Sequence, residues 1–207
     1  MLDDAVIKKV LAEALSRGGD LAEIFVEDRR STSLKLEDSR IEDVNSGRDQ
    51  GAGVRILSGE RASYAYTNLL TTNALMDAAR AARAGLSGSP TEVADLRRVR
   101  APVEHPVEIP PSDIGAQEKA SSLQAADDAA RSEGGEVRQV VATYLDLRQR
   151  VLIASSDGRR AEDDRTRVRL GVRVVAARDS EIATGFDGPG HSGGYELLHR
   201  QDPADVG

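Results

Sequence analysis

Apolar residues recur along this chain of 207 residues with two different periods. Near the start they stand three or four positions apart, which predicts an amphipathic helix over residues 6–15 that ends at Gly18-Gly19. Residues 72–84 and 112–133 show the same helical spacing, and a short helix is expected at 195–200. These stretches each offer an apolar stripe that could cover a sheet.

Between the helical stretches, apolar and polar residues alternate with the period of half-buried strands. The alternating runs are residues 22–26, 34–36, 41–44, 54–56, 62–66, 137–147, 151–154, 168–174 and 182–186. Turn-type clusters separate them at Glu37-Asp38-Ser39, Asn45-Ser46-Gly47, Ser58-Gly59 and Ser156-Asp157-Gly158. Connections this short predict antiparallel hairpins, because a parallel crossover needs about a dozen residues or more.

This order of elements predicts an α+β fold, with antiparallel sheets covered by helices on one face. We expect a first helix–strands–helix unit at residues 1–86 and a second at 112–200. Residues 87–111 would be a proline-rich connector, with one edge strand near 96–99. Residues 201–207 would begin a linker to a further domain.

The two units resemble each other, which suggests an internal duplication. The run from Gly53 to Leu57 corresponds to the run from Gly171 to Val175, and the same shift aligns Asp28 with Asp146 and Leu34 with Leu152. A duplication predicts that Gly53 and Gly171 occupy equivalent strand positions. The alternative is that two strand-rich segments fall into partial register by chance.

Composition narrows the function. The net charge is −7, and only 3% of the residues are aromatic. An acidic chain without an aromatic platform is a poor binder of nucleic acid, and we interpret the arginine pairs at residues 29–30, 97–98 and 159–160 as solvated. No cysteine, no apolar run of roughly 18 residues and no positively charged leader are present. A cytoplasmic protein with an aliphatic core is expected.

Candidate sites are few. His105, His191 and His199 lack the spacing that would place two imidazoles on one helical face, so a two-histidine metal site is disfavoured. Residues 188–193 match G-x-G-x-x-G, but the preceding strands are predicted antiparallel and the following helix is short. A flexible glycine turn is the preferred interpretation.

Two further groups of residues are candidate sites. Asp157 and Glu162-Asp163-Asp164 could hold a hard cation, yet arginines interleave with them and favour a solvated hairpin end. Ser155 and Ser156 lack a nearby histidine and a nucleophile elbow. The residues by themselves therefore predict no catalytic, cofactor-binding or metal-binding position in this chain.

Three segments resemble the amino-terminal region of the TldD/PmbA family, also called modulators of DNA gyrase. They are residues 22–66 with Asp49-Gln50-Gly51-Ala52-Gly53-Val54-Arg55, residues 156–170 with Ala161-Glu162-Asp163, and residues 185–198 with Gly194-Tyr195-Glu196. The Ala-Glu-Asp and Val-Arg-Leu stretches are more similar to TldD subunits than to their PmbA (TldE) partners. His191 departs from the basic or small residue that family members often carry in the glycine run.

The resemblance implies a two-domain, dimer-forming subunit of a zinc-type metallopeptidase that acts on unfolded or modified peptides. Its H-E-x-x-x-H motif lies in the second half, and no position here matches it. The implied partners are a carboxy-terminal domain, a TldD/PmbA-type subunit or a second copy, and a peptide. This chain alone would be inactive, with a role in assembly and peptide positioning. The alternative is a non-catalytic module that regulates a partner such as DNA gyrase.

The end of the sequence is consistent with truncation. Asp202 is a candidate N-cap and Pro203 a candidate first residue of a helix that the chain does not complete. We therefore expect the segment after Gln201 to be frayed, and the remainder to fold by itself.

Overall fold

Helices and one eight-stranded sheet form the fold of a computed structural model that describes residues 1–99 and 105–206. The helical elements, with 3-10 turns marked η, are α1 (Asp4–Ala14), α2 (Thr72–Ala82), η1 (Pro111–Asp113), α3 (Ala116–Ser132), α4 (Glu196–Arg200) and η2 (Pro203–Val206). The strands are β1 (Leu21–Glu37), β2 (Arg40–Ser58), β3 (Arg61–Thr67), β4 (Arg97–Val99), β5 (Val137–Ser155), β6 (Arg159–Arg178), β7 (Glu181–Asp187) and β8 (Gly190–His191). The predicted α+β class is confirmed.

The strand order is β3-β2-β1-β5-β6-β4, and β7 and β8 also pair with β6. The β2–β3, β6–β7 and β6–β8 pairs are antiparallel, as predicted. Gln139 donates to Glu37 and Gln149 donates to Glu27, so β1 and β5 also run in opposite directions. The exception is the predicted edge strand, β4, which pairs with β6 in parallel. The connection between them includes α3 and β5, which is long enough for a parallel pairing.

Four strands are longer than the alternation predicted. Asn45-Ser46-Gly47 was predicted to be a turn but lies inside β2. The break expected between residues 147 and 151 likewise lies inside β5. Residues 40–49 of β2 are all exposed, so no side chain there carries a burial signal. Backbone hydrogen bonds to β1 hold this part of β2 in the sheet. Such bonds cannot be inferred from the pattern of apolar and polar side chains.

The described residues divide into two compact units, each assembled from three stretches of the chain. Unit 1 comes from Met1–Arg29, Arg48–Glu104 and Gln149–Asp164, and unit 2 from Arg30–Gly47, His105–Arg148 and Arg165–Gly207. Each of β1, β2, β5 and β6 therefore contributes a segment to both units. The linear division at residues 86 and 112 stays a prediction.

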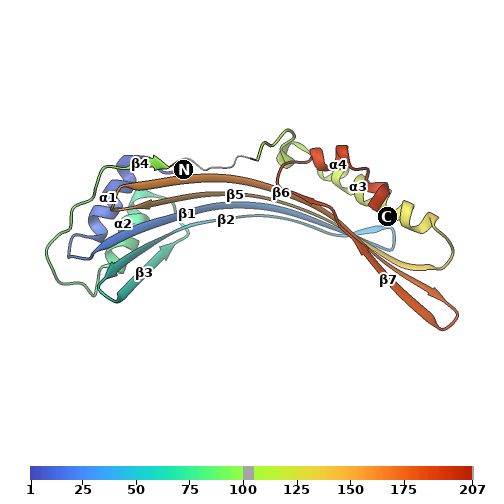
Figure 1. The fold of residues 1–207 in the computed structure, drawn as a ribbon, viewed down its shortest axis with the longest axis horizontal. Coiled ribbons are helices and arrows are strands. Elements are labelled where there is room, and N and C mark those ends of the chain that lie inside the picture. The colour runs from blue at the N-terminus through green and yellow to red at the C-terminus, as the bar shows by residue number, and fades with distance from the viewer. Residues whose placement is uncertain (100–104, 207) are drawn as a thin grey trace. The chain divides into compact units, whose positions relative to one another are not determined.

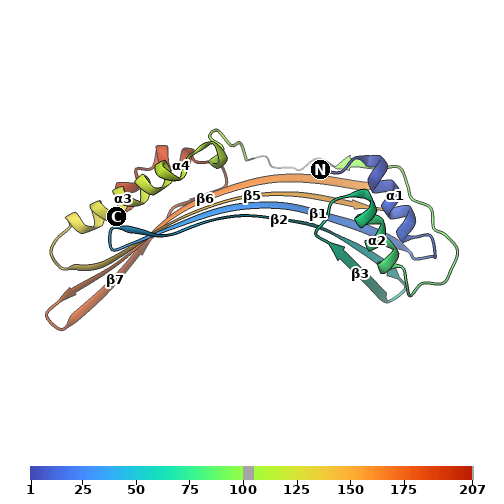
Figure 2. The ribbon, with the colours of Figure 1, turned by 180° about the vertical axis from the view of Figure 1, so that it is seen from behind.

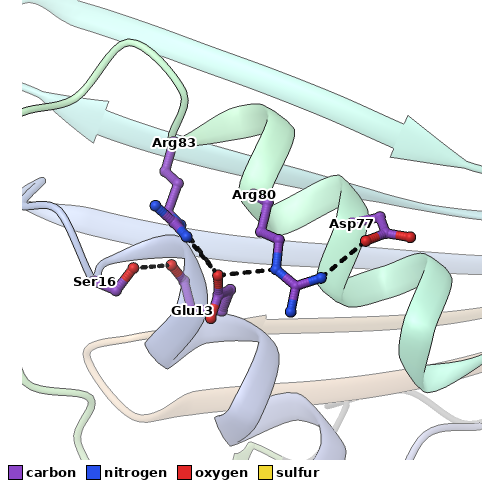
Figure 3. A network of polar contacts seen from close by, with 5 residues as sticks. All are labelled: Glu13, Ser16, Asp77, Arg80 and Arg83. Atoms are coloured by element: carbon purple, nitrogen blue, oxygen red, sulfur yellow. Dashed lines mark hydrogen bonds and ion pairs between the residues drawn. The ribbon is translucent and has the colours of Figure 1, made fainter.

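In unit 1, α1 and α2 cover one face of the strands, as Figure 1 and the reverse view in Figure 2 show. The core is aliphatic, as expected: its fully buried members include Ile7, Leu11, Ile24, Val54, Leu75 and Leu152. The carboxylate of Glu13 on α1 accepts hydrogen bonds from Arg83 at 2.7 Å and Arg80 at 3.3 Å, and Arg80 also reaches Asp77 on α2 (Figure 3). The Arg83 hydrogen bond lowers the pKa of Glu13, so the clamp between the helices is ionised at neutral pH.

In unit 2, α3, α4 and η2 pack over the strands (Figure 1). The core contains two tyrosines, Tyr144 and Tyr195, whose ring centroids lie 6.0 Å apart. Val206 of η2 also belongs to this core and is only 6% exposed. The expectation of a frayed end after Gln201 is therefore wrong, because an apolar residue near the end has a partner on the core.

Two local predictions at the helix ends have different outcomes. Asp202 does cap the last turn, accepting a hydrogen bond from the Ala204 N–H at 3.0 Å, and Pro203 is its first residue. The helix expected at 112–133 begins only at Ala116, because Ile114 has an extended backbone (φ −98°, ψ 124°). Pro111 starts a separate 3-10 turn before it.

A buried ion pair crosses unit 2. Lys119 of α3 and Asp146 of β5 are joined at 2.7 Å, and their side chains are 5% and 11% exposed. The Lys119 ammonium also lies 5.3 Å from the centre of the Tyr144 ring. Burial, together with the neighbouring Asp146 charge, raises the pKa of Tyr144, so its hydroxyl stays protonated.

Gly53 and Gly171 lie at similar places on β2 and β6, although Gly53 pairs with Tyr66 of β3 and Gly171 precedes the first β6–β7 pair. Gly53 stands two residues before Arg55, which pairs with Tyr64, and Gly171 stands two residues before Arg173, which pairs with Phe186. A Cβ at Gly53 would overlap the Tyr64 ring, and one at Gly171 would touch the Phe186 ring at 3.4 Å. Gly53 thus leaves room for the Tyr64 ring, whereas the nearest atom to a Cβ at Gly171 would be the Thr143 hydroxyl oxygen at 3.2 Å. The duplication itself stays a hypothesis.

We predict that Lys119→Met lowers the free energy of unfolding by about 3–5 kcal/mol, because it leaves the Asp146 carboxylate buried without its partner. Urea unfolding monitored by circular dichroism measures the change. The double variant Lys119→Met/Asp146→Leu should recover most of the loss. A loss that persists in the double variant would show that the side-chain shape of Lys119, and not the charge, is what matters.

Candidate functional site

The three histidines do not form a common site. His105 is exposed in the connector. His191 on β8 is 3.5 Å from Glu196, whereas His199 on α4 is 3.7 Å from Glu118 and makes an edge contact with the Tyr195 ring. Among residues 1–99 and 105–206, no group of three or more His, Cys, Asp or Glu side chains could hold a metal ion.

The glycine run surrounds a carboxylate that belongs to the chain itself. Glu196 accepts a hydrogen bond from the Gly194 N–H at 2.7 Å and another from the Ile109 N–H at 3.0 Å. A Cβ at Gly194 would overlap the Ile109 carbonyl oxygen, and one at Gly193 would overlap the His191 ring. Glycine is therefore needed at these positions for close packing. The interpretation as a flexible turn is wrong about why glycines occur here. The glycine run does not form a phosphate-binding site of the dinucleotide type, because β8 pairs antiparallel with β6 and α4 has five residues.

Glu196 therefore fastens the connector to the end of unit 2. Although burial raises the pKa of a carboxyl group, the backbone N–H donors around Glu196 outweigh that effect and lower its pKa to about 2. The side chain is 4% exposed. The resemblance included Glu196 but assigned it no role; the available signal was an acidic residue two positions after Gly193-Gly194, where a carboxylate can reach free N–H groups.

The acidic and serine candidates have structural partners. Glu162 binds Arg160 at 2.7 Å, Asp157 binds Arg159 at 2.6 Å, and Asp164 lies 3.7 Å from Arg150. The Ser156 hydroxyl accepts a hydrogen bond from the Ala22 N–H, and the Ser155 hydroxyl donates to Asp157. The acidic residues expected to be solvated at a hairpin end are therefore paired with arginines, and both serine hydroxyls are engaged in hydrogen bonds.

One member of the arginine pairs, Arg160, is not solvated. Arg97 and Arg98 on β4 lie beside Arg159 and Arg160 on β6, in register. Arg160 is 3% exposed and contacts Asp4 and Glu162. The sequence interpretation was wrong for Arg160, since its neighbours along the chain gave no sign that α1 would supply a carboxylate.

Two grooves lie on the strands of the sheet, and aromatic side chains border each of them. In unit 1 a groove of about 290 Å³ is bordered by Phe25, Tyr64 and Tyr66, and the two tyrosine rings stack with centroids 6.3 Å apart. In unit 2 a groove of about 430 Å³ is bordered by Phe186 and Leu145. The expectation that the chain has no aromatic platform is therefore wrong for unit 1, where three of its few rings gather.

The two grooves differ in charge. The groove in unit 1 contains the carboxylates of Glu27 and Asp49 and no Lys, Arg or His. The groove in unit 2 contains Lys35 and Arg169, with the Arg169 guanidinium 5.6 Å from the Phe186 ring, and one carboxylate, Asp43. These are surfaces for binding, since neither holds a nucleophile beside a base.

We predict that Glu196→Gln destabilises the protein at neutral pH by about 3 kcal/mol, the equivalent of lowering a carboxyl pKa from 4.5 to about 2. Because the folded-state pKa is the lower one, this stabilisation is present above about pH 4.5 and is lost as the pH falls towards 2. Urea unfolding at several pH values should show the variant and the parent converging in acid. Glu181→Gln on the exposed strand β7 is the matched control, and an equal effect there would contradict the assignment.

Sequence comparisons match two consecutive stretches of the chain to one family. A sequence profile described as PmbA/TldA metallopeptidase domain 1 matches residues 22–85, and one described as the central domain of the same metallopeptidases matches residues 109–207. A metalloprotease of Methanothermobacter thermautotrophicus is 29% identical over 91% of this chain and 41% of its own length. A metalloprotease TldD homolog of Haemophilus influenzae is 27% identical over 92% of this chain and 40% of its own length.

Solved structures agree in fold. A putative modulator of a DNA gyrase from Thermotoga maritima superposes with a TM-score of 0.78 at 15% identity, covering 98% of this chain and 45% of its own. TldE from Thermococcus kodakarensis gives a TM-score of 0.64 at 14% identity, covering 90% of this chain and 43% of its own. The chain thus spans about two fifths of the length of its curated relatives, and it belongs to the PmbA/TldD family.

Proposed function

We propose that this chain is the amino-terminal part of a TldD-like metal-dependent peptidase of the cytoplasm, in which it contributes to subunit assembly and positions unfolded or modified peptides. The observation that carries this proposal is the match of residues 22–85 and 109–207 to metallopeptidase domain profiles. The names of the curated relatives support the reaction class. The catalytic zinc and its ligands would belong to sequence beyond this chain.

The described residues do not fit a catalytic metal. His191 and His199 each face a different glutamate, and no third ligand joins either pair. We therefore derive no catalytic step for this chain. A separate carboxy-terminal domain that holds the metal would leave this part to bind and orient the chain being cut.

Strand β7 supports a role in assembly. All seven of its residues are exposed, yet it presents Ile182 and Phe186, which are 76% and 60% exposed. Apolar side chains grouped on a two-stranded hairpin are typical of a surface that a partner covers. A TldD/PmbA-type subunit, a second copy or the carboxy-terminal domain would supply that cover in a dimeric enzyme.

A second candidate is a non-catalytic module that regulates a partner such as DNA gyrase. It is favoured by the names of two related structures, from Thermotoga maritima and Bacteroides thetaiotaomicron, both called putative modulators of DNA gyrase. The net charge of −7 opposes direct contact with DNA. Such a module would bind the gyrase protein.

We predict that the 207-residue chain alone cleaves no peptide and retains no stoichiometric zinc after dialysis, because residues 1–99 and 105–206 contain no set of zinc ligands. A longer protein that contains the H-E-x-x-x-H motif should do both. Metal analysis and cleavage of an unfolded peptide test the two proteins side by side. Zinc held by the short chain and released by His191→Ala or His199→Ala would overturn the prediction. Gyrase binding by a longer protein without cleavage would favour the second candidate.

A further inference from the structure

The groove in unit 1, here called the tyrosine groove, has the chemistry of a binding site for a cation. Its principal residues are Phe25, Glu27, Asp49, Gly53, Tyr64 and Tyr66. Tyr64 and Tyr66 are 62% and 79% exposed, so their ring faces are available to a ligand. Aromatic faces attract ammonium and guanidinium groups.

The carboxylates in the tyrosine groove are not neutralised by the chain. Glu27 accepts its hydrogen bond from Gln149, which is neutral. The nearby arginines are engaged elsewhere, Arg48 with Asp28 at 2.8 Å and Arg55 with Glu23. Since none of the described residues that line the groove is Lys, Arg or His, a cation from another molecule would complement its charge.

The groove also borders a sheet edge. β3 ends the strand order, and within the part of the chain that the structure describes no strand pairs with its second edge. The two-residue turn after Ser58 makes Ser58–Arg61 a hydrogen-bonded pair, and such pairs alternate along an antiparallel ladder. The backbone groups of Ala62, Tyr64 and Tyr66 therefore point away from β2, where an added strand could bind them.

Gly53 sets the position of one ring. Because it lacks a Cβ, the Tyr64 side chain can lie across the strand at this point. The ring is then held against the sheet before any ligand binds, which reduces the entropy lost on binding.

We propose that an extended peptide segment adds to the free edge of β3 and places a lysine or arginine side chain against Tyr64 and Tyr66, close to Asp49 and Glu27. This docking proposal deepens the proposed function and rests on it only for the claim that the bound peptide is a substrate. Binding itself requires only the tyrosine groove and the free edge of β3. The groove in unit 2 carries Lys35 and Arg169 beside Phe186, so it does not select the same side chain.

Fluorescence anisotropy of labelled eight-residue peptides with the full chain tests this. The peptides alternate threonine with lysine, glutamine or glutamate. The lysine peptide should bind about tenfold more tightly than the glutamine peptide, and the glutamate peptide more weakly still. N-methylation of alternate backbone amides should abolish binding, because the added strand then loses its donors. Equal affinity for the lysine and glutamine peptides would overturn the proposal.

Matched variants locate the site. Tyr66→Ala should weaken lysine-peptide binding about fivefold and Tyr66→Phe should preserve it, while Asp49→Asn with Glu27→Gln should remove the preference for lysine. Val99→Ala on β4, at the other end of the strand order, is the control and should leave peptide binding unchanged. Circular dichroism confirms that each variant is folded. A preference that survives the Asp49 and Glu27 changes, or a dimer by light scattering that Tyr66→Ala dissociates, would contradict a peptide site.

Cleavage by the longer protein separates this inference from the proposed function. If it cleaves peptides but Asp49→Asn with Glu27→Gln does not alter the ratio of rates for lysine and glutamine peptides, the docking site is wrong and the peptidase stands. If the lysine peptide binds as expected and is never cleaved, the peptidase is wrong and the docking site stands.

Discussion

The structure depends on buried residues that keep one parity along β1, a strand of 17 residues that contributes to both units. In β1, Ile24 and Val26 are buried in the core of unit 1, and Leu34 and Leu36 in that of unit 2. All four have even numbers, so one face of this strand contributes to both cores. A slip of one residue would expose every one of them.

The same alternation explains the buried acids. Asp28 of β1 and Asp146 of β5 share the parity of the core residues on their strands and are each 8% exposed. Each faces a cation, Arg48 for Asp28 and Lys119 for Asp146. A carboxylate on the inward row is tolerated because a partner offsets its desolvation. The sequence shift that aligns Gly53 with Gly171 also aligns these two acids, which supports the duplication hypothesis.

Helices and tight turns were predictable from the sequence because their signals are local. The spacing at residues 72–84 and the turn at Ser156-Asp157-Gly158 need no knowledge of partners. The strand through Asn45-Ser46-Gly47 was missed because only its backbone is bound. The tyrosine groove was missed for a different reason: Phe25 and Tyr66 are far apart in sequence and meet only through the order β1, β2, β3.

If the two units arose by duplication, the two grooves show which of their features the fold requires and which features could change. A glycine beneath an aromatic ring is a backbone requirement, since any Cβ at Gly53 would displace Tyr64. The surrounding charges carry no such requirement, because Asp49 and Arg169 lie outside both cores. One scaffold could therefore keep its ring and glycine while its rim became acidic in unit 1 and basic in unit 2. Charge at the rim then selects the ligand, and the shared backbone only presents the strand to which it binds.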